Sequence, residues 1–299
     1  MHKAGFVNIV GNPNVGKSTL SNLLVGERLS IITSKAQTTR HRIFGIVNGT
    51  DSRGDEYQMV FSDTPGVLSP NYRLQDAMLN YSLEALQDAD VLLYVTDTVE
   101  TPDKHSDFLQ KVEKVKCPII VLINKIDLID QTQLEEKVAY WHQQIPAAEI
   151  VPVSALHGFN TSGIIDHIAD LLPQAEPFYD KDQLTDKPTR FFITEIIREK
   201  ILLYYKKEIP YSVEVEIEEF VEQEDQTDIK AVIHVTRDSQ KGIIIGHQGV
   251  AIKKLGTLAR RDIERFLDRK VFLSLYVKVT KDWRDKDFAL KQFGYDVKK

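Results

Sequence analysis

The sequence predicts an α/β domain with a doubly wound, mostly parallel sheet, followed by a smaller α+β domain. Val91–Thr96 and Ile119–Ile123 are continuous apolar runs, as expected for strands that are buried on both faces of a parallel sheet. Helical patterns such as Leu74–Gln87 and Leu134–Gln144 alternate with the strand candidates, which is typical of doubly wound folds. A length of 299 residues is enough for two domains.

The first domain is expected to span residues 1–173. It begins with an apolar run, Phe6–Val10, then a glycine-rich turn, and then a helix that starts near Ser18. Tyr57–Phe61 is a further strand candidate. Leu172 and Pro173 end the last helix of this domain, because proline disfavours a helical conformation in the residue before it.

Residues 174–188 contain two prolines and several charged residues without an apolar period, so we interpret them as a linker. The second domain then covers residues 189–299. Its expected elements, in order, are a helix, two strands, a helical region and a strand: Phe191–Tyr205, Val213–Val221, Ile229–Val235, Gly249–Phe266 and Val271–Val279. Glu214, Glu216 and Glu218 alternate with apolar residues in the first of these strands and are expected to face solvent.

The charge of the chain is divided unevenly between its two ends. The whole chain has a net charge of −6, but residues 230–299 contain 17 Lys and Arg against 8 Asp and Glu. The C-terminal part therefore favours an anionic partner, or else presents a basic face that is merely solvated. The single cysteine, Cys117, excludes an internal disulfide. No run is long and apolar enough for a membrane span or a signal peptide, so we expect a cytoplasmic protein.

A phosphate-binding loop follows the first strand. The segment G-N-P-N-V-G-K-S matches the P-loop pattern at every fixed position and opens a helix, as this motif requires. Its backbone N–H groups and the helix N-terminus can surround phosphate, and the lysine can reach the β- and γ-phosphates. We therefore expect nucleotide binding by Gly11, Asn12, Pro13, Asn14, Val15, Gly16, Lys17, Ser18 and Thr19.

Two further segments are expected beside the phosphates. Asp63, Thr64, Pro65 and Gly66 form a D-x-x-G motif after a strand, where the carboxylate can hold Mg²⁺ and the glycine N–H can contact the γ-phosphate. Gln37–Arg42 lies between this motif and the P-loop and is expected to be a switch that orders around Mg²⁺. The metal ligands are expected among Ser18, Thr38, Thr39 and Asp63, and the sequence does not choose between Thr38 and Thr39.

The base is expected to be guanine. Asn124, Lys125 and Asp127 form an N-K-x-D motif after a buried strand, and Asp127 can accept hydrogen bonds from the guanine N1–H and amino group, a donor pair that adenine lacks. Asn124 is expected to connect this loop to the P-loop. Ser154, Ala155 and Leu156 follow the next strand, and the Ala155 N–H can contact the guanine O6. Together the motifs predict a GTPase.

We expect the catalytic groups to be Lys17, Asn14, Thr39 and Gly66. Many GTPases orient the attacking water with a glutamine directly after the D-x-x-G glycine. Val67 occupies this position here and cannot do so. Asn14 could instead hold K⁺ beside the phosphates, where the cation would stabilise the charge on the leaving oxygen. The alternative for Asn14 is a hydrogen bond that braces the loop.

A G-x-x-G loop in the second domain predicts RNA binding. Gly246 and Gly249 flank His247 and Gln248 between apolar helical segments, and such a loop lets the backbone of a nucleic acid approach the chain. The surrounding strands fit the order of a type II KH domain. The basic residues on either side of the loop are Lys241, Lys253, Lys254, Arg260 and Arg261. The alternative is a packing corner between two helices that carries solvated lysines.

These motifs, together with the segments E-I-I-R-E-K and E-I-P-Y-S-V-E-V within Glu195–Val215, resemble the Era family of bacterial GTPases over essentially the whole chain. The resemblance implies binding of GTP and GDP with Mg²⁺, and binding of small-subunit ribosomal RNA near its 3′ end during assembly of the small ribosomal subunit. It also implies peripheral contact with the inner face of the cell membrane, although no amphipathic or lipidated segment is evident. We expect a monomer that does not bind DNA.

Three hypotheses remain distinct at this point. In the favoured one, GTP orders the switch loops and thereby changes the access of the C-terminal domain to RNA. In the second, the C-terminal domain of a GTPase docks a protein partner instead. In the third, a metabolic P-loop enzyme transfers phosphate to a small substrate, although the sequence shows neither an acceptor pocket nor a base for it.

Overall fold

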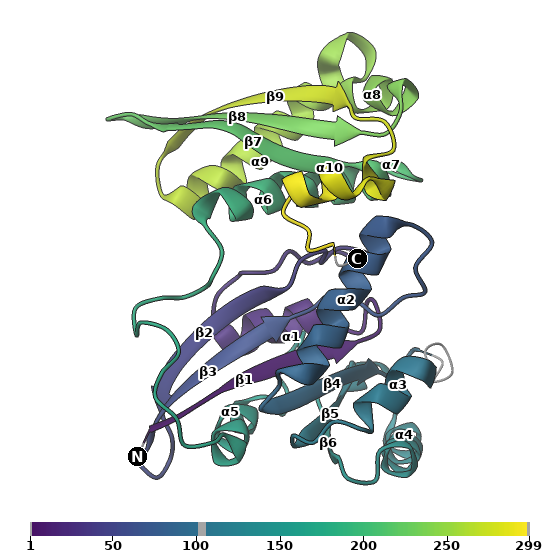
Figure 1. Cartoon of the computed structure of the whole chain (residues 1–299), viewed down its shortest axis with the longest axis vertical. Helices are drawn as coiled ribbons and strands as arrows, with labels where there is room; N and C mark the ends of the chain where they lie inside the picture. The colour runs from purple at the N-terminus through teal and green to yellow at the C-terminus, as the bar shows by residue number, and fades with distance from the viewer. Residues whose placement is uncertain (1, 101–105, 298–299) are drawn as a thin grey trace. The chain divides into compact units, whose positions relative to one another are not determined.

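The computed structural model describes residues 2–100 and 106–297 (Figure 1). The chain divides into two compact units, each with its own sheet. The first unit comprises Met1–Pro70 and Met78–Asp186, and the second comprises Asn71–Ala77 and Lys187–Lys299. Among the described residues, no helix is both long enough and apolar enough to cross a membrane.

The first unit contains a six-stranded sheet with the strand order β2-β3-β1-β4-β5-β6. Adjacent strands pair in parallel except for β2, which is antiparallel to β3. The mostly parallel sheet of the prediction is therefore confirmed. The strands are β1 (His2–Gly11), β2 (Ile43–Thr50), β3 (Glu56–Asp63), β4 (Val91–Asp97), β5 (Ile119–Asn124) and β6 (Glu149–Pro152).

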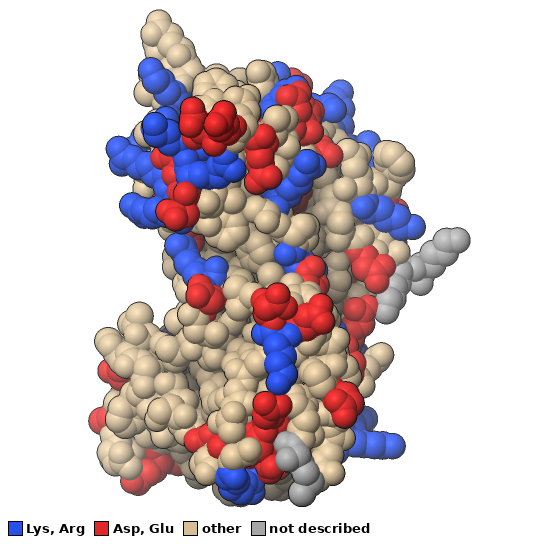
Figure 2. Space-filling view, turned by 90° about the vertical axis from the view of Figure 1, so that its left-hand side faces the viewer, with Lys and Arg blue, Asp and Glu red and all other residues tan. Residues whose placement is uncertain are grey.

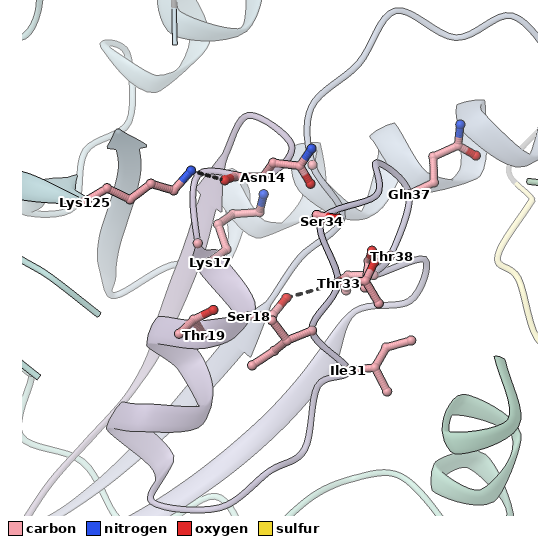
Figure 3. Close-up of a pocket in the computed structure, with 14 residues that line it drawn as sticks. Asn14, Lys17, Ser18, Thr19, Ile31, Thr33, Ser34, Gln37, Thr38 and Lys125 are labelled. Carbon is pink, nitrogen blue, oxygen red and sulfur yellow. Dashed lines mark hydrogen bonds between the residues drawn. The ribbon is translucent and has the colours of Figure 1, made fainter. Parts of the chain in front are cut away.

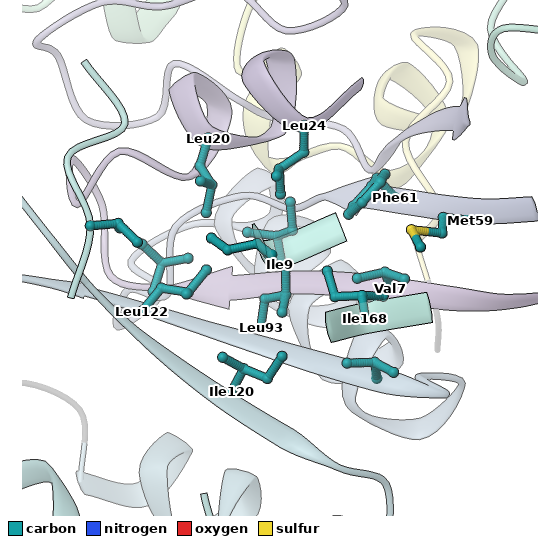
Figure 4. Packing of buried hydrophobic residues seen from close by; sticks show 14 of the residues in the cluster. Val7, Ile9, Leu20, Leu24, Met59, Phe61, Leu93, Ile120, Leu122 and Ile168 are labelled. Carbon is teal, nitrogen blue, oxygen red and sulfur yellow. The ribbon is translucent and has the colours of Figure 1, made fainter. Parts of the chain in front are cut away.

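Helices cover both faces of this sheet. They are α1 (Lys17–Val25), α2 (Arg73–Gln87), α3 (Ser106–Val112), α4 (Gln131–Gln144) and α5 (Ser162–Leu171), with the short 3-10 helix η2 (Ile126–Leu128). On one face, Leu20 and Leu24 of α1 and Ile168 of α5 pack on alternate strand residues such as Ile9 and Leu93 (Figure 4). Helices α2, α3 and α4 cover the other face through a second apolar cluster.

The segment 174–186, which the sequence indicates as a linker, has no helix or strand but lies along the first unit. The Gln58 side chain donates to the Tyr179 carbonyl at 2.8 Å and accepts from the Phe178 N–H at 2.7 Å. The Ile46 N–H donates to the Leu184 carbonyl at 2.8 Å. The chain is thus attached to the first unit up to Asp186, rather than being free from residue 174 onward.

The second unit has the α+β order of a type II KH domain. Its elements are α6 (Thr189–Tyr204), α7 (Ile209–Ser212), β7 (Glu214–Glu222), β8 (Gln226–Val235), α8 (Asp238–Ile245), η3 (His247–Gly249), α9 (Val250–Leu267), β9 (Lys270–Val279), η4 (Trp283–Asp285) and α10 (Asp287–Gln292). β8 pairs antiparallel with β7 and parallel with β9. Helices α6, α8 and α9 share one apolar core with this sheet.

The end of the described chain covers residues on the opposite face of the small sheet. Trp283 is fully buried, and its indole N–H donates to the Ser212 carbonyl at 3.0 Å. The Tyr295 hydroxyl donates to Glu214 at 2.6 Å. Glu214 is therefore buried, so the expectation of an exposed side chain at this position is wrong. The alternation of apolar and acidic residues along β7 correctly places Glu214 on the face opposite the apolar core. It does not reveal that a later segment of the chain covers this face.

Candidate functional site

The P-loop encloses Lys17 beside the carboxyl end of β1. Gly16, with a φ of +100°, forms the N-cap of α1. A side chain at this position would place its Cβ 2.2 Å from the amide nitrogen of Asn124, so only glycine fits. The Lys17 ammonium donates to the carbonyls of Gly11 and Asn12, at 3.1 and 2.8 Å. Burial lowers the pKa of Lys17 to about 8, because desolvation disfavours the ammonium ion.

A cavity of about 350 Å³ opens beside this loop. Figure 3 shows Lys17 and Ser18 on one side of it and the segment that carries Thr33, Ser34 and Thr38 on the other. Thr19 and Gly66 also line the cavity. Its lining also includes residues that we did not select from the sequence, namely Ile31, Ile32, Thr33 and Ser34. These four precede the Q-T-T motif and carry no motif of their own.

Three oxygen-bearing side chains meet at one edge of the cavity. The Ser18 hydroxyl lies 2.8 Å from the Thr39 hydroxyl and donates to Asp63 Oδ2 at 2.7 Å. The other Asp63 oxygen, Oδ1, is buried without a hydrogen-bond partner, and burial raises the pKa of this carboxyl group. A buried carboxylate beside two hydroxyls is a donor set that suits a hard divalent cation such as Mg²⁺.

The two adjacent threonines of the switch segment point to different partners. Thr39 faces Ser18 and lies 3.5 Å from Asp63 Oδ2. The Thr38 hydroxyl instead donates to the Lys35 carbonyl at 2.6 Å and lies 2.6 Å from the Thr33 hydroxyl. Further along, Arg42 pairs with Asp88 at 2.7 Å and does not line the cavity. The segment Gln37–Arg42 therefore lines the cavity with its first three residues, Gln37, Thr38 and Thr39.

The D-x-x-G segment packs directly on the P-loop. A Cβ at Gly66 would lie 2.7 Å from the Cα of Pro13. The Val67 N–H donates to the Gly11 carbonyl at 3.1 Å, and the Val67 side chain is buried in the apolar cluster beneath α2 and α3. Val67 thus belongs to the core and does not face the cavity. The Thr64 hydroxyl donates to the Ile9 carbonyl at 2.7 Å, which fixes this segment to β1.

Asn124 joins three of the predicted loops. Its amide donates to the Val15 carbonyl of the P-loop at 2.7 Å and accepts from the Ala155 N–H at 2.9 Å. The predicted contact of the Ala155 N–H with the guanine O6 would therefore require this N–H to share its hydrogen bond with Asn124. The Ser154 hydroxyl donates to Asp127 at 2.6 Å, whereas Leu156 is exposed. Asp130 caps the helix that follows, α4.

Lys125 connects the same loop to the P-loop and to Asp97, one of two acids that sequence reasoning missed. Its ammonium donates to the Asn14 carbonyl at 2.6 Å (Figure 3) and to Asp97 at 2.5 Å. Asp97 ends β4, and the Glu100 carboxylate accepts from Asn12 at 2.7 Å. No motif marks these two acids. Their position after a buried parallel strand was the available signal, because the carboxyl ends of such strands meet at one edge.

The G-x-x-G loop of the second unit is held in a glycine-dependent conformation. Gly246 has a φ of +73°, and a Cβ there would lie 2.6 Å from the Cβ of Ala251. Gly249 has a φ of +76° but faces open space. Between them, His247 and Gln248 are exposed. The Tyr205 hydroxyl donates to the Ile244 carbonyl at 2.9 Å and anchors the end of α8.

A groove of about 360 Å³ lies between α9 and β9. Lys253 and Arg260 line it, together with apolar and small residues that we did not select: Ile252, Gly256, Phe272, Leu273 and Leu275. Lys241, Lys254 and Arg261 lie outside its lining. Lys254 instead lies over the Tyr204 ring, with its ammonium 5.5 Å from the ring centroid. Lys and Arg are frequent on the second unit in Figure 2.

Comparisons with known proteins agree with this arrangement. A family model described as 50S ribosome-binding GTPase matches residues 6–125, and a KH domain model matches residues 208–284. The chain is 43% identical to a GTPase Era of Geotalea daltonii, over 98% of both chains.

Two solved structures are similar over nearly the whole chain. An Era variant of Aquifex aeolicus bound to GDP and AlF₄⁻ is 38% identical, with a TM-score of 0.91 over 98% of this chain and 99% of that one. An Era complex with MgGDPNP and nucleotides 1506–1542 of 16S ribosomal RNA is also 38% identical, with a TM-score of 0.92 over 99% of both chains.

Proposed function

Because this chain belongs to the Era family of GTPases, we propose that it uses GTP to control binding of small-subunit ribosomal RNA during assembly of the small ribosomal subunit. The chain is a P-loop GTPase that converts GTP and water to GDP and phosphate. The observation that carries the guanine-nucleotide part is the position of Asn124, which binds the P-loop and the Ser154–Leu156 loop at once.

The phosphate end of the site works mainly by positioning and charge. Lys17 neutralises phosphate charge at the P-loop, and Gly66 brings its backbone against that loop. Ser18, Thr39 and Asp63 are the residues that would hold Mg²⁺. When bound, this ion neutralises charge on the phosphate oxygens. We assign the role to Thr39 in preference to Thr38, whose hydroxyl is directed at Lys35 and Thr33.

Water activation must involve a group other than Val67, since that side chain is buried. Asn14 is exposed at the cavity, with a φ of +66°. We propose that its side-chain oxygen helps to hold K⁺ beside the phosphates. Hydrolysis should then be faster in K⁺ than in Na⁺, and Asn14→Gly, which also accepts a positive φ, should remove the difference. Equal rates of the wild-type protein in the two salts would contradict this role.

The groove between α9 and β9 suits single-stranded RNA. Lys253 and Arg260 can contact phosphates, while Gly256, Leu273 and Leu275 leave an apolar surface for bases. The G-x-x-G loop beside it exposes backbone at Gly249, where a Cβ atom would have no atom within 4 Å other than those of its own segment of chain. We propose that the 3′ end of the small-subunit ribosomal RNA occupies this groove.

Nucleotide preference tests the first half of the proposal. Phosphate release should be substantial with GTP and negligible with ATP. Asp127→Asn should lose GTP and gain xanthosine triphosphate, because the carbonyl at position 2 of xanthine accepts a hydrogen bond that an amide can donate. Equal turnover of GTP and ATP by the wild-type protein would refute the assignment.

A matched pair of variants tests the RNA half. Lys253→Glu with Arg260→Glu reverses charge inside the groove, whereas Lys254→Glu with Arg261→Glu makes the same change on the same helix outside it. The first pair should abolish binding of a single-stranded 3′-terminal RNA and the second should weaken it less. Wild-type binding should fall steeply with salt. Salt-independent binding, or equal effects of the two pairs, would favour a protein-docking domain.

Control of RNA binding by the nucleotide forms a separate part of the proposal. The RNA affinity should differ between the GDPNP-bound and GDP-bound protein, and identical affinities would contradict a switch. We also propose a cytoplasmic monomer that contacts the inner membrane surface peripherally and does not bind DNA. Flotation with vesicles tests the membrane contact, mass measurement in solution tests the monomeric state, and DNA competition tests the absence of DNA binding.

A further inference from the structure

A groove between α2 and α3 lies outside both sites described above. It consists of two cavities of about 310 and 490 Å³ that share Leu83 and Lys111 in their linings and are therefore continuous. All of its lining residues belong to the first unit. Figure 1 shows α2 and α3 on the same side of the large sheet.

The floor of the groove is apolar. Leu79, Leu83 and Leu86 of α2 line it along one side, and Phe108 and Val115 along the other. Apart from the buried Phe108, these side chains are half-buried and pack on the core of the unit. They are recessed between two helices, so a segment of chain can insert side chains against them.

Three lysines line the larger cavity, and one of them, Lys111, also lines the smaller one. Lys111, Lys114 and Lys116 line the larger cavity and are exposed. None of the three has an ion pair or side-chain hydrogen bond with another described residue. Asp107 lines the smaller cavity, Glu113 is exposed between the lysines, and Asp88 and Asp90 flank the lining residue Ala89. The charged residues that line the larger cavity itself are nevertheless all basic.

The smaller cavity is formed in part by the segment that follows the D-x-x-G motif. Val67, Leu68 and Pro70 line the smaller cavity. Because the Val67 N–H is bonded to the Gly11 carbonyl of the P-loop, this segment is in direct contact with the nucleotide site. A molecule bound in the groove would touch the segment without touching the nucleotide.

We propose that this groove is the docking site for an acidic amphipathic segment of a protein partner, and that docking alters nucleotide exchange. The apolar side chains of the partner occupy the floor, and its carboxylates face Lys111, Lys114 and Lys116. A membrane surface fits less well, because the apolar groups are recessed between the helices and do not project from the surface.

Cys117 provides a local probe, because it is the only cysteine of the chain and lines the larger cavity. The full-length protein is alkylated with iodoacetamide in the presence of a designed amphipathic helix that has Leu on one face and Glu beside it. Burial raises the pKa of the thiol, so the rates are compared at one mildly alkaline pH. Protection of about tenfold is expected at a peptide concentration ten times its Kd.

The controls separate charge recognition from generic binding. Lys111→Glu with Lys114→Glu should remove the protection while leaving GDP affinity unchanged, which also shows that the variant is folded. Lys137→Glu with Lys181→Glu, outside the groove lining, should retain it. The same helix with Lys in place of Glu should not protect Cys117. The bound acidic helix should also change the release rate of a fluorescent GDP analogue.

Absence of protection by the acidic helix would overturn the proposal, as would equal protection by the two helices or in the Lys111/Lys114 variant. Protection by vesicles of anionic phospholipid, without protection by the helix, would assign the groove to the membrane instead. Protection with an unchanged release rate would refute the effect on nucleotide exchange.

Discussion

Replacement of Asn124 by alanine should weaken guanine-nucleotide binding directly, and the increase in Kd should be larger than any decrease in the free energy of unfolding can explain. Asn124 is 3% exposed, and truncation leaves the Val15 carbonyl and the Ala155 N–H without their partner. A buried group without its hydrogen bond costs about 1–3 kcal/mol. These two hydrogen bonds join the loops around the nucleotide, so we expect their removal to reduce the free energy of nucleotide binding by about 3 kcal/mol. A reduction of this size corresponds to roughly a 100-fold higher Kd.

The assay is titration with a fluorescent GDP analogue, with denaturant unfolding of the same protein as a parallel measurement. Asn48→Ala is the matched control, because the Asn48 side chain donates to the Lys181 carbonyl and accepts from Gln58, and it does not line the nucleotide cavity. We expect the control to change stability without changing the Kd. Asn124→Asp should weaken nucleotide binding as Asn124→Ala does, because a carboxylate cannot donate a hydrogen bond to the Val15 carbonyl. A Kd for Asn124→Ala within threefold of wild type would refute the reasoning.

Three further predictions concern other parts of the chain. Above about pH 8, GDP affinity should fall by up to tenfold per pH unit, because burial lowers the pKa of Lys17 to about 8 and only the ammonium form attracts phosphate; a flat titration between pH 7 and pH 9.5 contradicts this. Gly246→Ala should lower the melting temperature of the second unit more than Gly249→Ala, because only the first substitution adds a clash to the strain of a positive φ; equal melting temperatures of the two variants would argue against it. Burial also lowers the pKa of His234, so the folded state binds fewer protons than the unfolded state. The free energy of unfolding of the second unit should therefore fall as the pH drops below about 6.5. In chemical denaturation, His234→Gln should make this free energy less dependent on pH.

The nucleotide motifs could be located from the sequence because each chemical role depends on a short contiguous run. Asp63 and Asn124 are the last residues of β3 and β5, and Lys17 begins the helix after β1. These strands end at the same edge of a parallel sheet, so order along the chain predicts proximity in space. The choice between Thr38 and Thr39 depends on backbone direction within one loop, which residue types alone do not specify.

Other features depend on contacts between distant segments. Asp97 and Glu100 contact the nucleotide loops but belong to no motif. The apolar lining of the RNA groove combines Gly256 of α9 with Leu275 of β9, and neither residue is unusual in its own element. Burial of Glu214 requires Tyr295, which lies 81 positions further along the chain. The local periodicity of apolar residues predicts helices and strands well, but it carries no information on contacts between residues that are far apart in the sequence.

Crosslinking in cells, followed by sequencing of the attached RNA, tests the central claim most directly. For the wild-type protein, the reads should concentrate at the 3′ end of the small-subunit ribosomal RNA, and Lys253→Glu with Arg260→Glu should remove that peak while GTP hydrolysis continues. Reads scattered over unrelated transcripts, or a 3′ peak that persists in the groove variant, would contradict the account.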